Sequence, residues 1–207
     1  IAYDIGARSV AQCLSTLLGA TTVLAGFSRL VIDLNRPIHH PGSIVEEIDG
    51  TLIPGNRRLK QSCAHIRINE LFDPYHKVIQ NEIKRISCLS RPPAIISMHS
   101  FSPTFGETPR PWDIGVLWNR DPRIAVPLIK ELEAQDFNVG NNEPYSGHEL
   151  AYTINVHGGD AGLANCALEI NQDQIRCTTG IKRWAGILRS VISSIMRRHG
   201  LSQVQHF

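Results

Sequence analysis

The sequence has no long uninterrupted hydrophobic run and no excess of charge of one sign. None of its 207 residues lies in a stretch of the roughly 20 consecutive apolar residues that cross a bilayer. Lysine and arginine total 21 against 19 aspartates and glutamates, and the basic residues are scattered along the chain. These absences argue against a membrane partner and against a nucleic-acid partner. We therefore expect a small-molecule ligand and, by default, a cytoplasmic location.

Cysteine is scarce, and several common motifs are missing. The five cysteines show no CxxC spacing, which argues against a disulfide framework and a zinc knuckle, so we expect reduced, mostly buried thiols. There is no G-x-S-x-G elbow and no glycine-rich P-loop or dinucleotide fingerprint. Serine-nucleophile hydrolysis and nucleotide binding therefore have no support in the sequence. Metal-assisted hydrolysis is the better class for this chain.

Hydrophobic periodicity predicts helices that alternate with strands. The predicted helices cover residues 8–19, 66–87, 122–135 and 181–198. The predicted strands cover residues 21–25, 30–34, 94–98, 113–118, 153–156 and 166–170, with long loops at 37–61 and 100–111. This alternation is typical of an α/β fold, and we expect a single domain over residues 1–207 with a mainly parallel, mixed sheet covered on both faces.

The segment VIDLNRP places polar residues directly after a predicted strand, where ligands bind in open α/β sheets. The guanidinium of Arg36 can grip a carboxylate through two parallel hydrogen bonds, and Asn35 adds an amide donor. A substrate that carries a carboxylate would suit this pair. The alternative is structural, with Arg36 paired to Asp33 or capping a loop.

Two further strand ends carry titratable residues. His99 follows an apolar run, where it could bind a metal, act as a general base, or form a structural hydrogen bond. Glu169 lies in a predicted buried strand, and burying an unpaired carboxylate is costly. Its charge needs an arginine such as Arg36 or Arg110, or a metal-bound water from which Glu169 takes a proton.

Taken together, five segments resemble one known family. VIDLNRP, HSFSP, RPWDIGVLWNRDPR, NEPYSG and LEINQD follow one another as in the N-formylglutamate amidohydrolase (N-formylglutamate deformylase) family, over about residues 3–173. That family is related to the zinc carboxypeptidases, so the resemblance implies a three-layer phosphorylase/hydrolase-like fold. It also implies zinc-dependent hydrolysis of N-formyl-L-glutamate to formate and L-glutamate, a step of histidine breakdown.

The resemblance also implies residue roles. Asn35 and Arg36 look like the pair that holds the substrate's carboxylate, His99 looks like a zinc ligand, and Glu169 looks like the general base. Tyr145 lies in NEPYSG, on a loop expected to close over substrate. Asp4, in a D-x-G-A pattern, would be a second metal ligand or would position one.

The sequence departs from the family at its start. It contains no match to the family's first zinc-binding segment, and it opens at Ile1 without a methionine. We expect upstream residues to complete the zinc site, because a catalytic zinc takes three protein ligands and a water. The alternatives are a carboxypeptidase-like amidohydrolase for another N-acyl amino acid and a catalytically inactive binding scaffold. The sequence leaves the oligomeric state open, although we expect the last helix to pack within the domain.

Overall fold

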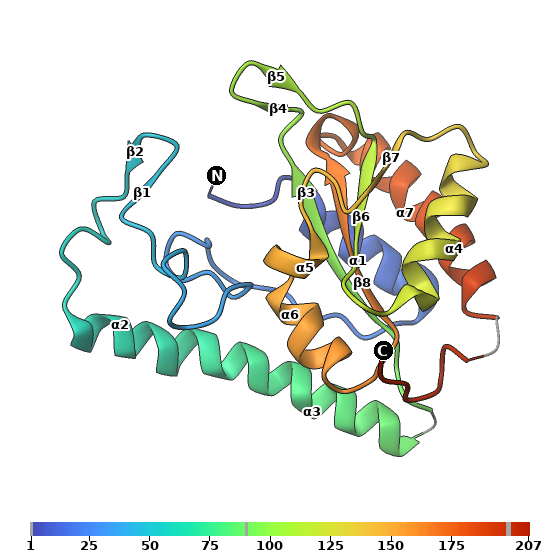
Figure 1. Ribbon diagram of the computed structural model, residues 1–207, viewed down its shortest axis with the longest axis horizontal. Helices are drawn as coiled ribbons and strands as arrows, with labels where there is room; N and C mark the ends of the chain where they lie inside the picture. Colours follow the sequence, from blue (N-terminus) through green and yellow to red (C-terminus); the bar gives the residue numbers. More distant parts are fainter. Residues whose placement is uncertain (1, 90, 198–199) are drawn as a thin grey trace.

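A four-stranded sheet lies between two layers of helices in the computed structural model, which describes residues 2–89, 91–197 and 200–207 (Figure 1). In chain order the elements are α1 (Ala7–Leu18), β1 (Glu47–Ile48), β2 (Thr51–Leu52), α2 (Gln61–Arg67), the π-helical η1 (Ile68–Phe72), α3 (Asp73–Leu89), β3 (Ile95–Phe101), β4 (Thr104–Phe105), β5 (Thr108–Pro109), β6 (Ile114–Leu117), α4 (Pro122–Glu133), β7 (Val139–Asn141), α5 (Gly147–Leu150), α6 (Tyr152–Ile154), the π-helical η2 (Asn155–Gly159), β8 (Asn165–Asn171), the 3-10 helix η3 (Gln172–Gln174) and α7 (Thr178–Ile195).

The central sheet is mixed, as predicted. Its strand order is β3-β8-β6-β7. The pairs β3–β8 and β6–β7 are parallel, and the antiparallel pair β6–β8 joins them. The small hairpins β1–β2 and β4–β5 lie outside this sheet (Figure 1).

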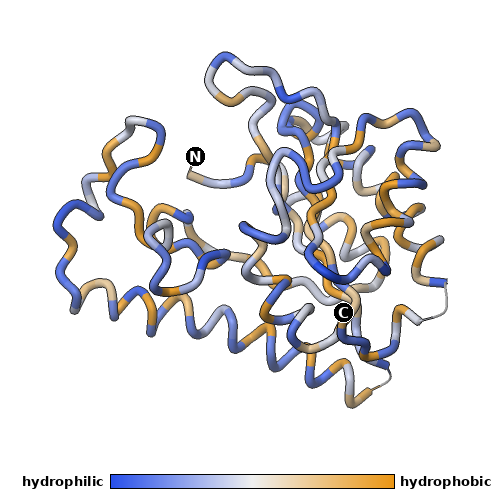
Figure 2. Tube along the Cα trace, in the orientation of Figure 1, coloured by the Kyte–Doolittle hydropathy of each residue, from blue (hydrophilic) through white to orange (hydrophobic). Residues whose placement is uncertain are grey.

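The main hydrophobic core fills one side of the sheet. Helices α1, α4 and α7 pack together against that face. Trp184 and Leu188 of α7 are fully buried there, so the last helix packs within the domain, as expected. In Figure 2 hydrophobic residues recur along the strands of the sheet and along these helices. The helix predicted over 181–198 corresponds to α7, which begins three residues earlier, at Thr178. Residue 198 lies outside the described residues.

The predicted strands at 21–25 and 30–34 are wrong, because the structure has no strand in either segment. The second segment instead packs against the long helical run α2–η1–α3, where Ile32 and Leu34 form a small core with Phe72. Short β-branched runs bury equally well against a helix, and periodicity alone does not separate the two cases. The predicted helix 66–87 falls within this run, which begins earlier, at Gln61.

The predicted strand at 153–156 is also wrong. Residues Tyr152–Ile154 form α6 and Asn155–Gly159 form η2. Ile154 packs there on the second face of the sheet against Leu117 and Ala167. Periodicity did not predict β7 or the two hairpins, all of which are very short.

The expectation that the cysteines are mostly buried is wrong as well. All five are free thiols, but Cys63, Cys88 and Cys177 are exposed and Cys13 is half-buried, so that Cys166 alone among them is buried. Within the described ranges, no helix is both long enough and apolar enough to cross a membrane.

Candidate active site

Strand pairing brings His99 and Glu169 together on the face of the sheet that α5 and α6 cover. The parallel register of β3 and β8 sets His99 opposite Glu169, and the register of β6 and β8 sets Gly115 on the other side of Glu169. Side chains alternate along a strand, so Leu168 and Ile170 point into the main core while Glu169 points to the opposite face. The predicted strand ended at residue 98; β3 continues to Phe101, so His99 lies within it.

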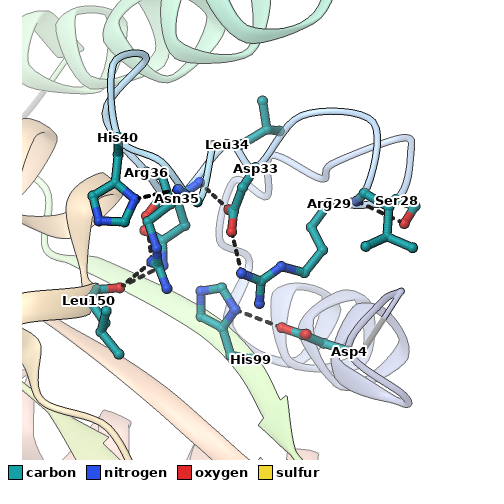
Figure 3. Close-up of polar contacts among 12 residues, drawn as sticks. Asp4, Ser28, Arg29, Asp33, Leu34, Asn35, Arg36, His40, His99 and Leu150 are labelled. Carbon is teal, nitrogen blue, oxygen red and sulfur yellow. Dashed lines mark hydrogen bonds and ion pairs between the residues drawn. The ribbon is translucent and has the colours of Figure 1, made fainter. Parts of the chain in front are cut away.

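The imidazole of His99 is held at both nitrogens. Its Nδ1 lies 2.7 Å from Oδ2 of Asp4 (Figure 3). Its Nε2 lies 3.0 Å from Oγ of Ser97. The Ser100 hydroxyl donates to the carbonyl of Ile5, which fixes the segment that carries Asp4 against β3. Burial alone would lower the pKa of His99, but the bond to Asp4 and the nearby carboxyl of Glu169 raise it to about 9. At neutral pH His99 and Asp4 therefore form an ion pair.

Glu169 is a buried acid with a free acceptor. Its side chain is 8% exposed in relative terms, and Oε2 has no hydrogen-bond partner among the residues that the structure describes. Burial raises the pKa of Glu169 to about 7, against the lowering effect of the charges on His99 and Arg110. A carboxyl that titrates near neutral pH suits a group that accepts and returns a proton.

The loop that carries Asn35 and Arg36 is braced by a salt bridge. Arg29 Nη2 lies 2.6 Å from Oδ2 of Asp33, and Oδ1 of Asp33 accepts a hydrogen bond from the Asn35 backbone N–H (Figure 3). Arg29 therefore takes the structural pairing that the sequence left open for Arg36. The Nη1 atom of Arg36 donates to the carbonyl oxygens of Asn35 and Leu150.

Asn35 connects this loop to the α5–α6 region. Its Oδ1 accepts from the Thr153 backbone N–H, and its Nδ2 donates to the Leu150 carbonyl. The bond to Leu150 uses one of the two Nδ2 hydrogens, which leaves the other for a ligand. The structure thus gives Asn35 a positioning role that residue type alone did not indicate.

Tyr145 reaches the site because two strands lack side chains beneath its loop. A Cβ atom at Gly115 would come 2.1 Å from the carbonyl oxygen of Glu143, and one at Gly140 would come 2.6 Å from it. The loop packs directly on the sheet over Gly115 and Gly140, which we call the bare strip. The Tyr145 hydroxyl accepts a hydrogen bond of 3.0 Å from Arg110. Glycine inside a strand marks such close approach, a signal that the sequence reading overlooked in DIGVL and NVGN.

Comparison with known proteins shows the family to which the chain belongs. Residues 1–176 match the family N-formylglutamate amidohydrolase. The chain belongs to the N-formylglutamate amidohydrolase family. It is therefore placed among hydrolases that act on carbon–nitrogen bonds other than peptide bonds.

Solved structures share the fold. A crystal structure of a gene product from Agrobacterium tumefaciens has a TM-score of 0.91 and 31% sequence identity, covering 94% of this chain and 78% of that one. An N-formylglutamate amidohydrolase from Ralstonia eutropha JMP134 has a TM-score of 0.68 and 17% identity, covering 91% of this chain and 80% of that one. No curated protein matches the chain.

The zinc ligands that the family resemblance implies can be tested against the side chains. Asp4 and His99 do lie together, but they bond to each other, and Nε2 of His99 faces Ser97. Across the described part of the chain, no group of three His, Cys, Asp or Glu side chains could hold a metal ion. The residues present therefore do not fit a three-ligand zinc site, and the metal stays a prediction.

Proposed function

We propose that this chain hydrolyses the formamide bond of N-formyl-L-glutamate to formate and L-glutamate. The observation that carries the proposal is the buried Glu169, whose unpartnered Oε2 lies on the same face as the His99–Asp4 pair. Family membership supports the class of reaction. The proposal includes a place in histidine breakdown and in the cytoplasm, which rests on the sequence resemblance and composition.

In the proposed reaction, Glu169 acts as the general base. Its carboxylate takes a proton from a water molecule, whose oxygen attacks the formyl carbon. The same proton then passes to the amide nitrogen as the C–N bond breaks, which gives formic acid and the free amine. The acid then loses its remaining proton to the amine, so that formate and the ammonium form of L-glutamate leave. His99, the protonated member of the His99–Asp4 ion pair, is the register neighbour of Glu169, where its positive charge would stabilise the negative charge that develops on the formyl oxygen.

Arg36 is the proposed anchor for a carboxylate of the substrate. Among the residues that the structure describes, the guanidinium of Arg36 donates from Nη1 alone, so Nη2 and Nε are available for a ligand. Firm anchoring is needed because a formyl group is small and offers few contacts of its own. The roles of Arg36 and Glu169 do not depend on a metal.

The test is formate release from N-formyl-L-glutamate by the purified chain, with N-acetyl-L-glutamate as the comparison for a larger acyl group. We expect turnover of the formyl compound, and Arg36→Ala should raise KM by about 10- to 100-fold with a smaller effect on kcat. Absence of formate, or equal turnover of both compounds, would overturn the assignment. Elemental analysis of the same preparation, before and after chelation, tests the predicted zinc separately.

A further inference from the structure

Arg110 lies in an aromatic cradle at the edge of the candidate site. Its backbone N–H donates to the Pro103 carbonyl, which closes the base of the β4–β5 hairpin. The guanidinium carbon lies 4.9 Å from the ring centre of Tyr145, 5.3 Å from that of Phe105 and 6.0 Å from that of Phe101. Three rings hold one cation by its flat face.

The edge of this guanidinium is available. The hydrogen bonds that Arg110 makes leave from Nη1, to the Tyr145 hydroxyl at 3.0 Å and to the Ser102 carbonyl at 3.5 Å. None of the ion pairs between described residues includes Arg110. Its Nε and Nη2 groups therefore keep their N–H donors, and such a fork matches a carboxylate in geometry and charge.

Arg110 and Arg36 both interact electrostatically with the carboxyl of Glu169. The charge of Arg110 acts on the carboxyl of Glu169, and the carboxyl of Glu169 acts on Arg36. Tyr145 links the two arginines, because it accepts a hydrogen bond from Arg110 and interacts electrostatically with Arg36. The site thus presents two separate guanidinium groups, both of which interact electrostatically with the proposed general base.

We propose that Arg110 is a second carboxylate-binding residue, which makes the site selective for N-acyl derivatives of dicarboxylic amino acids. One guanidinium grips one carboxylate, and the proposed substrate carries two. Arg36 takes one carboxylate and Arg110 takes the other, with Tyr145 holding Arg110 in place. This inference rests on the proposed function, because it assigns a residue to the second charge of that substrate.

The test compares Arg110→Gln with the unaltered chain on N-formyl-L-glutamate and on N-formyl-L-glutamine, which lacks the second charge. Loss of a charged hydrogen-bond pair predicts a fall in kcat/KM of about 100-fold on the glutamate compound, mainly through KM. Both substrates are measured well above pH 7, where Glu169 is ionised with or without the charge of Arg110, and on the glutamine compound the variant should then stay within about threefold of the unaltered chain. Arg110→Lys, which keeps the charge but loses the fork, should fall between the two. Equal losses on both substrates, or no loss, would overturn the proposal.

A matched control and a binding measurement complete the design. Arg183 of α7 has its guanidinium carbon 5.6 Å from the ring centre of Phe137 and 6.0 Å from that of Trp184. Arg183→Gln therefore removes a similar contact away from the site and should leave both activities unchanged. Calorimetric titration with glutarate, a bare dicarboxylate, needs no turnover. We expect Arg110→Gln to weaken glutarate binding at least about tenfold. If the unaltered chain releases no formate from either substrate, the proposed function fails, while unequal glutarate binding still supports Arg110 and equal binding refutes it.

Discussion

The two faces of the central sheet are built in different ways. The face under α1, α4 and α7 is closed by large apolar side chains, and Leu168 of β8 is fully buried there. On the opposite face the next residue of the same strand is Glu169, flanked by His99 and by a glycine with no side chain. Because side chains alternate between the two faces along β8, consecutive residues of this strand serve the core on one face and the proposed chemistry on the other.

The polar face is held together mainly by side chains that bond to backbone. Its hydrophobic cluster is small, and short elements cover it. Oδ1 of Asn142 accepts from the backbone N–H groups of Trp118 and Gly147, and Nδ2 of Asn155 donates to the Gly147 carbonyl. Asn35 does the same for the loop that carries Arg36. Such bonds fix geometry without large apolar side chains.

The sharpest test of this division exchanges one residue on each face. Glu169→Gln removes the proposed base, so kcat should fall by about 10²- to 10⁴-fold while thermal stability is kept or raised, because a buried carboxyl is replaced by a neutral amide. Leu168→Ala should instead lower the free energy of unfolding by about 2–5 kcal/mol with kcat per folded molecule preserved. Steady-state kinetics and denaturant titration measure both effects. If each variant changed both quantities alike, the two faces would not be separable.

The pH dependence of activity should follow Glu169. Burial raises its pKa to about 7, and a general base must be ionised to work. We expect kcat/KM to rise about tenfold per pH unit below 7 and to level off above it. A profile of formate release between pH 5 and pH 8 measures this limb. A limb near pH 4.5, the ordinary range of a glutamate, would mean that another group limits the rate.

A methyl group on the bare strip of the polar face should also reduce activity. Gly115→Ala puts a Cβ against the Glu143 carbonyl and must displace the loop that carries Tyr145. We expect kcat/KM to fall by roughly tenfold, since misplacing a contact residue by about an ångström is enough to slow an enzyme. Gly186→Ala is the matched control: a Cβ there has open space on a helix, so it should stabilise by up to about 1 kcal/mol with activity unchanged. Equal activities in the two variants would show that the loop does not depend on Gly115.

The sequence predicted long elements well and short ones poorly. The core helices and the strands that carry His99 and Glu169 follow from periodicity, because one face of each is continuously apolar. The register sets these two residues side by side, and their roles in a site stay predictions. The bonds of His99 to Asp4 and of Arg29 to Asp33 join residues whose partners depend on the folded loop. The strand predicted at 153–156 was wrong for a related reason: the backbone of α6 is held by a distant residue, Asn35, which accepts a hydrogen bond from the Thr153 N–H over a hundred positions along the chain.

The last prediction concerns the buried pair His76 and His157, which lies next to the loop of Asn35. Nε2 of His76 lies 3.0 Å from the Leu34 carbonyl, which can only accept, so His76 carries its proton there. Its Nδ1 must then accept from Nε2 of His157, 2.7 Å away. The pair thereby ties α3 and η2 to the residue that precedes Asn35. Burial, together with the nearby His76, lowers the pKa of His157 to about 4, and burial also lowers the pKa of His76.

A histidine whose pKa is lower in the folded state stabilises the fold above its unfolded pKa of about 6.5, and this contribution is lost as the pH falls toward 4. His157→Gln keeps an N–H donor but does not titrate. We expect the stability advantage of the unaltered chain over this variant to shrink by about 2 kcal/mol between pH 7 and pH 4. Denaturant titrations across that range measure it, with His148→Gln on the exposed surface of α5 as the control. Parallel curves for the chain and the His157 variant would show that the pair does not resist protonation, and that the loop of Asn35 is held by its bonds to α6 alone.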